Sequence, residues 1–468
     1  MAVETKLFVF KHHSPVSVIW AVAIAGLLVV ALGCGRGNPI TPSSSPVQVK
    51  IADAPAERVV SFELTVNSVT LTKSDNSTVT VLNTPTRVEL THLSASPEPL
   101  RLVSVPQGTY TKATINVAQP EVKFVNDLGQ LVEAAATLTS STAIVNFSPA
   151  VTIGSGATSL NFDLDLAASV AINPVNSTAS VTPTFTASSA SIPAESEQEA
   201  ENGEMDDITG TVTSVSGNSF TISVEQSPDA MTFATDANTQ FEAPLTGLSS
   251  LSNNMIVEVD GVTKPDGSLL AKKVEAEVEV QAGEELEGLV TSVTGAPATQ
   301  FKIVLQDEAG PGTLPPLGTE ITVAVDNNTN FKVDSDKVDL SNLPFPSAFD
   351  ANTLAKAQKV EADTEQPGVT PIPAKKVKLK RQALNGTVSG YAQNGQQATF
   401  MLNFANDSAF FLLTGKTSAK VLQQPGTELK GITTPIADNT AVRVRGVLFF
   451  DPTGLGAYNL VASRISIP

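Results

Sequence analysis

The amino-acid sequence predicts an all-β protein, in which a sandwich of antiparallel strands is followed by three small barrel repeats and preceded by a signal or anchor helix. The chain has 468 residues, of which 41% are hydrophobic and only 16% charged. Such a composition favours strands and turns over solvated helices. Hydrophobic and polar residues alternate in many short runs, and one pattern recurs three times in the second half. A prior of about 150 residues per domain also indicates several domains.

The composition excludes several classes of function. The 47 acidic and 29 basic residues give a net charge of −18, and a surface of this charge repels phosphate, so we expect no nucleic-acid partner. Cys34 is the only cysteine, and His92 is the only histidine after residue 33. Intrachain disulfides are therefore excluded, and His/Cys zinc sites and Ser–His–Asp triads are nearly so, because His92 is the one histidine left to form them. We expect no catalytic residue, no cofactor and no metal.

The N-terminal segment has the order of an export signal. Lys6 and Lys11 precede an uncharged apolar run at residues 16–32, and Gly33 and Cys34 follow. A basic part, an apolar part and small residues at the end are typical of a signal peptide. The apolar run is long for a cleaved signal, which leaves an uncleaved anchor helix open.

Residues 31–34, Ala-Leu-Gly-Cys, resemble the lipobox of bacterial lipoproteins, although Ala31 stands where leucine is commonest. This resemblance implies cleavage before Cys34, lipidation of Cys34 and anchoring in the membrane through the lipid. Gly35 is compatible with sorting to the outer membrane, so an outer-membrane or cell-surface location is favoured over an inner-membrane one. An ordinary signal peptide and a retained helix remain alternatives.

The first folded unit is predicted to be a sandwich of antiparallel strands. Residues 59–69 alternate, with Phe62, Leu64 and Val66 at the same parity, as in a half-buried strand. Turn residues separate the later runs, and this spacing suits a sandwich. Strand-like runs recur at residues 87–93, 110–117, 122–125, 143–147 and 160–172.

Four motifs of this unit resemble the bacterial family catalogued as domain of unknown function 4382. They are Ile-Ala-Asp-Ala-Pro at residues 51–55, the strand at 62–71, Val-Pro-Gln-Gly-Thr-Tyr at 105–110 and Leu-Asn-Phe-Asp-Leu at 160–164. The resemblance implies an envelope β-sandwich and transfers no catalytic residue.

Four polar residues of the sandwich are considered as candidates for a metal or ligand site. Asp53, Asp163 and Asp165 are the residues that a metal site would use, but sites for hard cations usually show a denser ligand motif. We therefore interpret these aspartates as polar residues of turns and strand edges. His92 stands alone, and we expect it at the surface or the rim of the domain.

The second half contains three imperfect copies of one pattern, in which Gly210, Gly288 and Gly386 align. Each copy offers about six short strands and a pair of glycines where curvature is needed, which predicts a small OB-like barrel. The pattern resembles the bacterial family catalogued as domain of unknown function 5666. The second copy carries an insertion at residues 344–366, with a short helix expected around residues 351–361.

OB-like barrels often bind nucleic acid, so we searched for a basic groove with stacking aromatic residues. A basic segment alternates along the closing strand of the second copy, and we interpret it as a solvated face rather than a site for polyanions. Its residues are Lys375, Lys376, Lys378, Lys380 and Arg381.

One further stretch has the start of a calcium loop. Asp326, Asn328 and Asn330 fit, but Phe331 and Lys337 stand where an EF-hand needs glycine and glutamate. A turn between two strands accounts for the same residues.

These observations predict a non-enzymatic, membrane-tethered envelope lipoprotein that acts as a structural, adhesion or protein-interaction module. An envelope protein or a glycan is a possible partner. Glycan binding is one alternative function, and a carboxylate-based hydrolase is another. The predicted organisation is a signal peptide at 1–33, a Pro/Ser-rich tether at 34–46, the sandwich at 47–191, an acidic linker at 192–207 and repeats at 208–282, 283–382 and 383–468.

Overall fold

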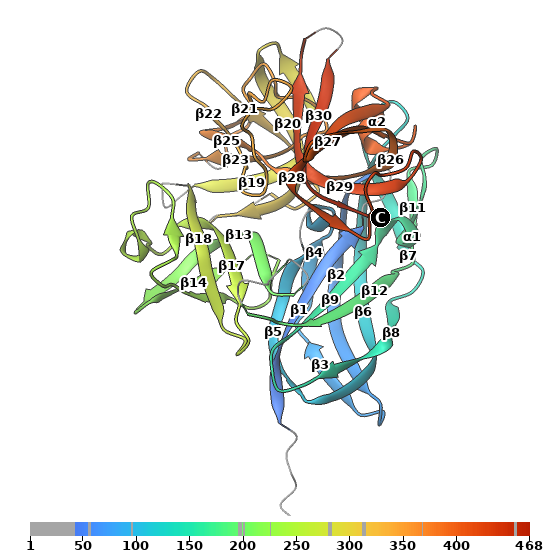
Figure 1. Cartoon of the computed structure of the whole chain (residues 1–468), viewed down its shortest axis with the longest axis vertical. Helices are drawn as coiled ribbons and strands as arrows, with labels where there is room; N and C mark the ends of the chain where they lie inside the picture. The colour runs from blue at the N-terminus through green and yellow to red at the C-terminus, as the bar shows by residue number, and fades with distance from the viewer. Residues whose placement is uncertain are drawn as a thin grey trace, which may run out of the picture. The chain divides into compact units, whose positions relative to one another are not determined.

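The structure is a computed structural model. It describes residues 43–54, 58–94, 97–194, 199, 202–224, 226–278, 283–310, 315–366, 368–453 and 456–468. The predicted signal peptide, Cys34 and almost all of the tether lie outside the described residues. Within them the chain forms the strands drawn in Figure 1 and a few single-turn helices. None of the described helices has the length and hydropathy that crossing a bilayer requires.

The first strands form a two-sheet sandwich, as predicted. Most strand pairs are antiparallel, but β1 and β9 run parallel, and so do β7 and β11. One sheet has the order β12-β9-β1-β5, and its strands are β1 (Ser44–Ala54), β5 (Glu98–Pro106), β9 (Thr158–Asp165) and β12 (Phe185–Ser191). The other has the order β10-β11-β7-β6-β2-β3, with β4 beside β2 and β8 beside β6; its strands are β2 (Val59–Lys73), β3 (Thr78–Leu82), β4 (Thr86–Glu89), β6 (Gly108–Val125), β7 (Leu131–Leu138), β8 (Thr142–Ile153), β10 (Val170–Asn173) and β11 (Thr178–Val181).

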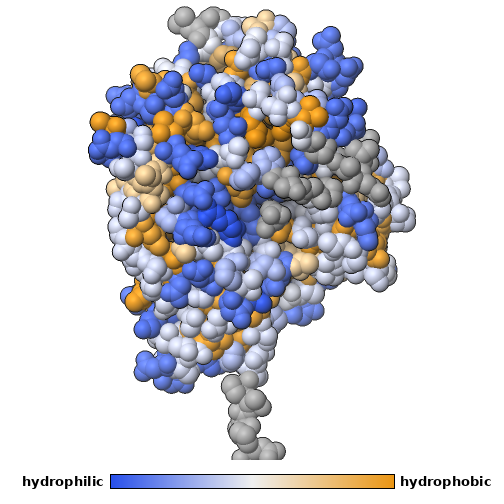
Figure 2. All heavy atoms as spheres, turned by 180° about the vertical axis from the view of Figure 1, so that it is seen from behind, coloured by the Kyte–Doolittle hydropathy of each residue, from blue (hydrophilic) through white to orange (hydrophobic). Residues whose placement is uncertain are grey.

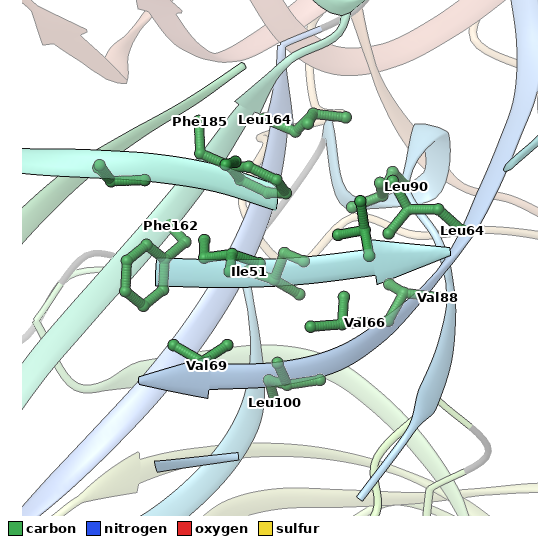
Figure 3. Close-up of a cluster of buried hydrophobic side chains, with 14 of the residues drawn as sticks. Ile51, Leu64, Val66, Val69, Val88, Leu90, Leu100, Phe162, Leu164 and Phe185 are labelled. Carbon is green, nitrogen blue, oxygen red and sulfur yellow. The ribbon is translucent and has the colours of Figure 1, made fainter. Parts of the chain in front are cut away.

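The alternation of hydrophobic and polar residues that predicted β2 corresponds to an alternation of buried and more exposed side chains in the strand. Phe62 and Leu64 are fully buried and Val66 is 1% exposed. In Figure 3, Leu64 and Val66 lie with Ile51 and Phe162 of the facing sheet in one apolar cluster. Burying a side chain of this size stabilises the fold by about 1.5–3 kcal/mol. The helix α1 (Leu166–Ser169) and the 3₁₀ helix η1 (Thr91–Ser94) connect strands of the sandwich.

Three groups of strands follow in the second half. The first group is β13 (Glu204–Ser216), β14 (Ser219–Ser223), β15 (Met231–Ala234), β16 (Gln240–Phe241), β17 (Ile256–Thr263) and β18 (Leu269–Val278), with the 3₁₀ helix η3 (Leu248–Ser250). The second is β19 (Glu284–Gly295), β20 (Ala298–Ala309), β21 (Glu320–Ala324), β22 (Asn330–Val333), β23 (Lys359–Thr364), β24 (Ile372–Pro373) and β25 (Lys376–Leu379). The third is β26 (Arg381–Asn394), β27 (Gln397–Asn403), β28 (Ser418–Lys430), β29 (Ala441–Asp451) and β30 (Ala457–Ser466), with α2 (Ala409–Thr414).

Each of the three groups has the same cyclic order of strand pairing. The third is a closed barrel, β26-β27-β28-β30-β29, in which β28 and β30 are parallel. In the first, the strands pair in the order β15-β14-β13-β17-β18, and the parallel pair β15–β18 closes the ring. In the second, the closing strand is divided into β24, which pairs β21, and β25, which pairs β23. We refer to these groups as barrels 1, 2 and 3.

The aligned glycines allow strands to approach closely. A Cβ on Gly210 would lie 2.8 Å from the carbonyl oxygen of Ser223, and one on Gly386 would lie 2.6 Å from that of Asn403. At Gly288 the Cβ would clash with the carbonyl of Val304. The first strand of each barrel therefore bends over the second at a position where a side chain has no room.

Two expectations from the sequence were wrong. The acidic linker was placed at residues 192–207, but β13 already begins at Glu204, since Lys337 pairs with Glu204 (2.6 Å) and Asp206 (3.3 Å). The helix expected around residues 351–361 is absent from the described residues there. The Asp350 carboxylate instead accepts hydrogen bonds from the backbone of Asn352 and Thr353 in a turn, and β23 follows.

Candidate functional site: a buried layer of charge

Acidic and basic side chains of barrels 1 and 2, together with Arg381 at the start of barrel 3, meet in a layer that is almost completely shielded from solvent. On β25, Lys376 and Lys378 alternate with Val377 and Leu379, which belong to the apolar core of barrel 2. The lysines extend from the opposite face of the strand. We call the following set the charge layer: Asp207, Glu258, Glu275, Glu277, Asp334, Glu361, Asp363, Lys376, Lys378, Lys380 and Arg381.

Lys378 lies at the centre of the layer. Its side chain is 6% exposed, and its ammonium donates hydrogen bonds to Glu258 (3.1 and 3.2 Å), Glu275 (3.3 Å) and Glu277 (3.1 Å). All three glutamates come from barrel 1, where Glu258 and Glu275 are register partners on β17 and β18. The ammonium therefore joins the two barrels.

Lys376 and Lys380 extend the layer on either side of Lys378. Lys376 pairs with Glu277, with Glu361 (3.2 Å) and with Asp363 (2.8 Å). Lys380 pairs with Glu258 (2.5 Å) and Glu361 (3.3 Å). Each lysine thus holds carboxylates of both barrels, and this makes the layer a continuous network.

Arg381 closes one end of the layer. Its guanidinium binds Asp334 (2.9 Å) of barrel 2 and Asp207 of barrel 1. The pKa of Asp334 is lowered, because Arg381 and two lysines outweigh the effect of its burial.

The pKa values in the layer shift in both directions. Burial would raise the pKa of Glu258, but Lys378 and Lys380 lower it to about 2. Burial and the charge of Glu361 instead raise the pKa of Glu277 to about 7, although two lysines contact it. Burial, followed by Glu361 and Glu277, raises the pKa of Glu285. The carboxyl groups of the layer outnumber its cations, and burial raises the pKa of those that the cations compensate least.

The basic segment was wrongly predicted as a solvated face. Lys376, Lys378 and Lys380 are each less than 10% exposed, and only Lys375 extends outward, with its side chain 64% exposed. The sequence held one signal for this arrangement, because Glu275 and Glu277 alternate on a strand of barrel 1 with the same period as the lysines. Periodicity identifies the face of a strand and leaves its partner open.

Three sets of carboxylates in the described part of the chain are close enough to share a metal ion, with their oxygens within 4.8 Å of one another. All three belong to the layer or border it: Glu258, Glu275 and Glu277; Glu277, Glu285 and Glu361; Asp207, Glu258 and Asp336. The ammonium of Lys378 already binds all members of the first set. In the other two sets, lysines or Arg381 bind at least two of the carboxylates. Fixed cations thus perform the neutralisation that a metal would supply.

A cavity of about 210 Å³ lies beside the layer. Glu277 and Asp363 line it, and burial raises the pKa of both carboxyl groups. Both also form ion pairs with the same Lys376 ammonium. In this geometry the ammonium of Lys376 lies between the two carboxylates.

The calcium-like stretch forms a turn beside this cavity. Asn328 and Asn330 line the cavity, whereas the Asp326 carboxylate accepts a hydrogen bond from the backbone of Asn328 (2.7 Å). This is the turn between β21 and β22, in agreement with the interpretation from sequence.

His92 is not at the surface or rim as expected, because it is only 5% exposed. Its Nδ1 lies 3.4 Å from Glu89 and its Nε2 lies 3.2 Å from Glu98. Burial would lower the pKa of His92, but Glu98 and Glu89 outweigh burial and raise it above its usual value. A lone histidine gives no sign in the sequence of the carboxylates that the fold brings to it.

The three aspartates considered for a metal lie at neighbouring positions of the parallel pair β1–β9 but have different surroundings. Asp165 caps α1 by accepting a hydrogen bond from the backbone of Ala168 (2.9 Å). Asp163 stands beside Ala52 in the parallel pair β1–β9. Asp53 is fully buried, so the expectation of a turn or strand-edge residue was wrong for it.

Two family models match parts of the chain. Residues 44–183 match the family model for a domain of unknown function (DUF4382), and residues 209–275 match that for another domain of unknown function (DUF5666). No curated protein matches the chain. Among solved structures, "drosophila Unr CSD456" matches at 11% identity with a TM-score of 0.14, over 53% of this chain and 92% of that chain. The sandwich thus matches the DUF4382 model and barrel 1 matches the DUF5666 model, and barrels 2 and 3 follow with the strand topology of barrel 1.

Proposed function

We propose that this protein is a non-enzymatic envelope lipoprotein, anchored through a lipid at Cys34, whose sandwich and barrels act as one rigid module in an adhesion, structural or protein-interaction role. The observation that carries the proposal is the charge layer. Flexibly linked domains expose their polar faces to water, whereas here the polar faces of two barrels are buried against each other.

Further polar contacts join the sandwich to the barrels. Gln226 of barrel 1 accepts a hydrogen bond from the Glu89 backbone (2.6 Å) and donates one to Asp307 of barrel 2 (2.9 Å). Gln306 donates a hydrogen bond to the carbonyl of Val60 in β2 (2.8 Å). These contacts favour a fixed arrangement of domains, and residues 42–468 form one compact unit. A rigid module presents one constant surface to a partner at little cost in conformational entropy.

The surface suits a protein partner better than a glycan. Hydrophobic and hydrophilic residues are interspersed on the face in Figure 2. Glycan sites commonly stack sugars on exposed tryptophan or tyrosine. The only tryptophan is Trp20, in the predicted signal peptide. Tyr110 is fully buried and Tyr458 is 5% exposed, while Tyr391 stacks on Phe400 with ring centroids 6.1 Å apart.

The anchoring is tested by expressing Cys34→Ala beside the wild type in a bacterial host with a lipoprotein pathway. We expect the wild type to incorporate labelled palmitate and to fractionate with membranes. The variant should lose the label and become soluble or accumulate as a precursor. A wild type that fractionates with membranes without incorporating label would refute the lipid anchor.

The rigidity is tested by placing spin labels at Thr213 of barrel 1 and Gln393 of barrel 3, both exposed strand residues, in a Cys34→Ser background. We expect a single narrow distribution of distances for the purified protein. A broad distribution would show that the barrels move independently and would contradict the module.

A further inference from the structure

A second cavity, of about 110 Å³, lies where the sandwich meets barrels 2 and 3. Asp53 lines it from the sandwich, Leu289 and Lys359 from barrel 2, and Phe404 and Phe410 from barrel 3. The two phenylalanine rings lie with their centroids 4.1 Å apart. Nine of the sixteen lining residues are apolar and seven are polar, with Asp53 as the one carboxyl group and Lys359 as the one cation in the wall.

Both carboxyl oxygens of Asp53 are buried, and neither has a hydrogen-bond partner among the described residues. Buried polar groups in proteins are almost always hydrogen-bonded, and an ionised carboxylate without a partner is especially costly. The strand β1 fixes Asp53 at this place, opposite Leu164 of β9. A group held so in a cavity wall is positioned to receive a partner from outside the chain.

The charged groups around Asp53 leave this position negative. Asp163, Glu89 and Asp165 act on it from the sandwich, and Arg443 from barrel 3. Arg443 is 8% exposed and does not hydrogen-bond to Asp53. The ammonium of Lys359, which also lines the cavity, already pairs with Glu287 at 2.6 Å. Three carboxyl groups thus act against one guanidinium.

We propose that this cavity binds a small organic ammonium ion, with Asp53 as its counter-ion and Phe404 and Phe410 covering its apolar part. The site supplies a carboxylate for the ammonium and aromatic rings for the adjoining carbon atoms. The volume corresponds to about four water molecules at roughly 30 Å³ each, which limits the ligand to a few non-hydrogen atoms.

Binding is coupled to the release of a proton. Burial, and then Asp163, raise the pKa of Asp53, which favours the neutral carboxylic acid when no cation is bound. When the ammonium enters, the acid loses its proton to water and the carboxylate pairs with the cation. One proton leaves for each cation bound, and affinity therefore rises with pH until Asp53 is ionised without ligand.

The probes for the experiment are propylammonium and the uncharged propan-1-ol, titrated into the full chain by calorimetry. We expect propylammonium to bind at least about 30-fold more tightly than the alcohol. In two buffers of different ionisation enthalpy, the measured heats should differ by an amount equal to about one proton released. Equal affinity for the two probes, no detectable binding of propylammonium at 10 mM, or binding without proton release would each overturn the proposal.

The variant Asp53→Asn removes the charge at constant shape, and we expect it to lose at least about 30-fold in affinity for propylammonium. The matched control is Asp75→Asn, which removes an exposed carboxyl group of the sandwich that does not line the cavity and should change the affinity by less than about threefold. Full affinity in Asp53→Asn would refute the role of this residue. The proton-release measurement uses the wild type alone, so it decides the proposal even if that variant fails to fold.

Discussion

Replacement of Lys378 by methionine should strongly destabilise the contact between barrels 1 and 2. The ammonium donates hydrogen bonds to Glu258, Glu275 and Glu277, and no other cation contacts all three. Methionine has similar length and no charge, so the variant keeps the packing of the stem and leaves these carboxylates with one cation fewer. Removal of one partner of a buried ion pair costs about 3–5 kcal/mol.

The matched control is Lys375→Met on the same segment. Lys375 is 64% exposed at its side chain and pairs with Glu365 at 3.7 Å. An exposed pair of this kind contributes about 0–1 kcal/mol. The two variants thus remove the same chemical group, three residues apart, from a buried network and from the surface.

The assay is guanidinium unfolding at pH 7 followed by far-ultraviolet circular dichroism, together with amide hydrogen exchange. We expect Lys378→Met to lower the free energy of unfolding by about 3 kcal/mol or more, and Lys375→Met by less than about 1 kcal/mol. Exchange should rise in β17, β18 and β25 of the Lys378 variant. If the two variants unfold at the same denaturant concentration, the charge layer does not hold the barrels together.

Three further predictions concern pH, strand packing and the anchor. Because the pKa of Glu277 rises from 4.5 to about 7 on folding, the folded state binds this proton more tightly, and the contribution of Glu277 to the free energy of unfolding should fall by about 3 kcal/mol as pH rises from about 4 to about 8. Unfolding curves measured across this pH range should show a flatter dependence for Glu277→Gln. An unchanged slope in this variant would contradict the raised pKa. Gly288→Ala forces a Cβ against the Val304 carbonyl and should destabilise the protein by about 1–3 kcal/mol in thermal unfolding. The control Gly156→Ala, at a position with open space around it, should have little effect. Equal melting temperatures for the two variants would refute the close approach of the strands at Gly288. Globomycin should block maturation of the wild type at Cys34, and normal processing in its presence would exclude a lipoprotein signal.

Local patterns in the sequence were sufficient to predict the strands. The parity of Phe62, Leu64 and Val66 is the parity of burial in β2, and the aligned Gly210, Gly288 and Gly386 mark the same close approach of strands in three barrels. Both signals are short-range, because burial on one face has period two and a steric limit acts on a single residue. The helix expected around residues 351–361 was wrong, since a short polar stretch gives a weak signal and the Asp350 turn prevailed.

The candidate sites depended on contacts between residues far apart in the chain. Lys378 was assigned to the wrong environment because its partner Glu258 stands 120 residues earlier, and His92 because the fold encloses it with Glu98. Asp53 was placed at a strand edge because nothing near it in the sequence indicates that a third barrel covers it. In each case the sequence showed a charged or titratable residue but did not show which residues the fold would bring next to it.

The sequence alone determined the all-β class, the sandwich and the repeated barrels, because alternation and glycine spacing act within a few residues. It also led to the prediction of export, with Cys34 as the anchoring residue. The tertiary structure decided which polar faces meet water and which meet each other. The free energy of a charge depends on the groups within a few ångströms and on its distance from solvent, and both are properties of the assembled fold.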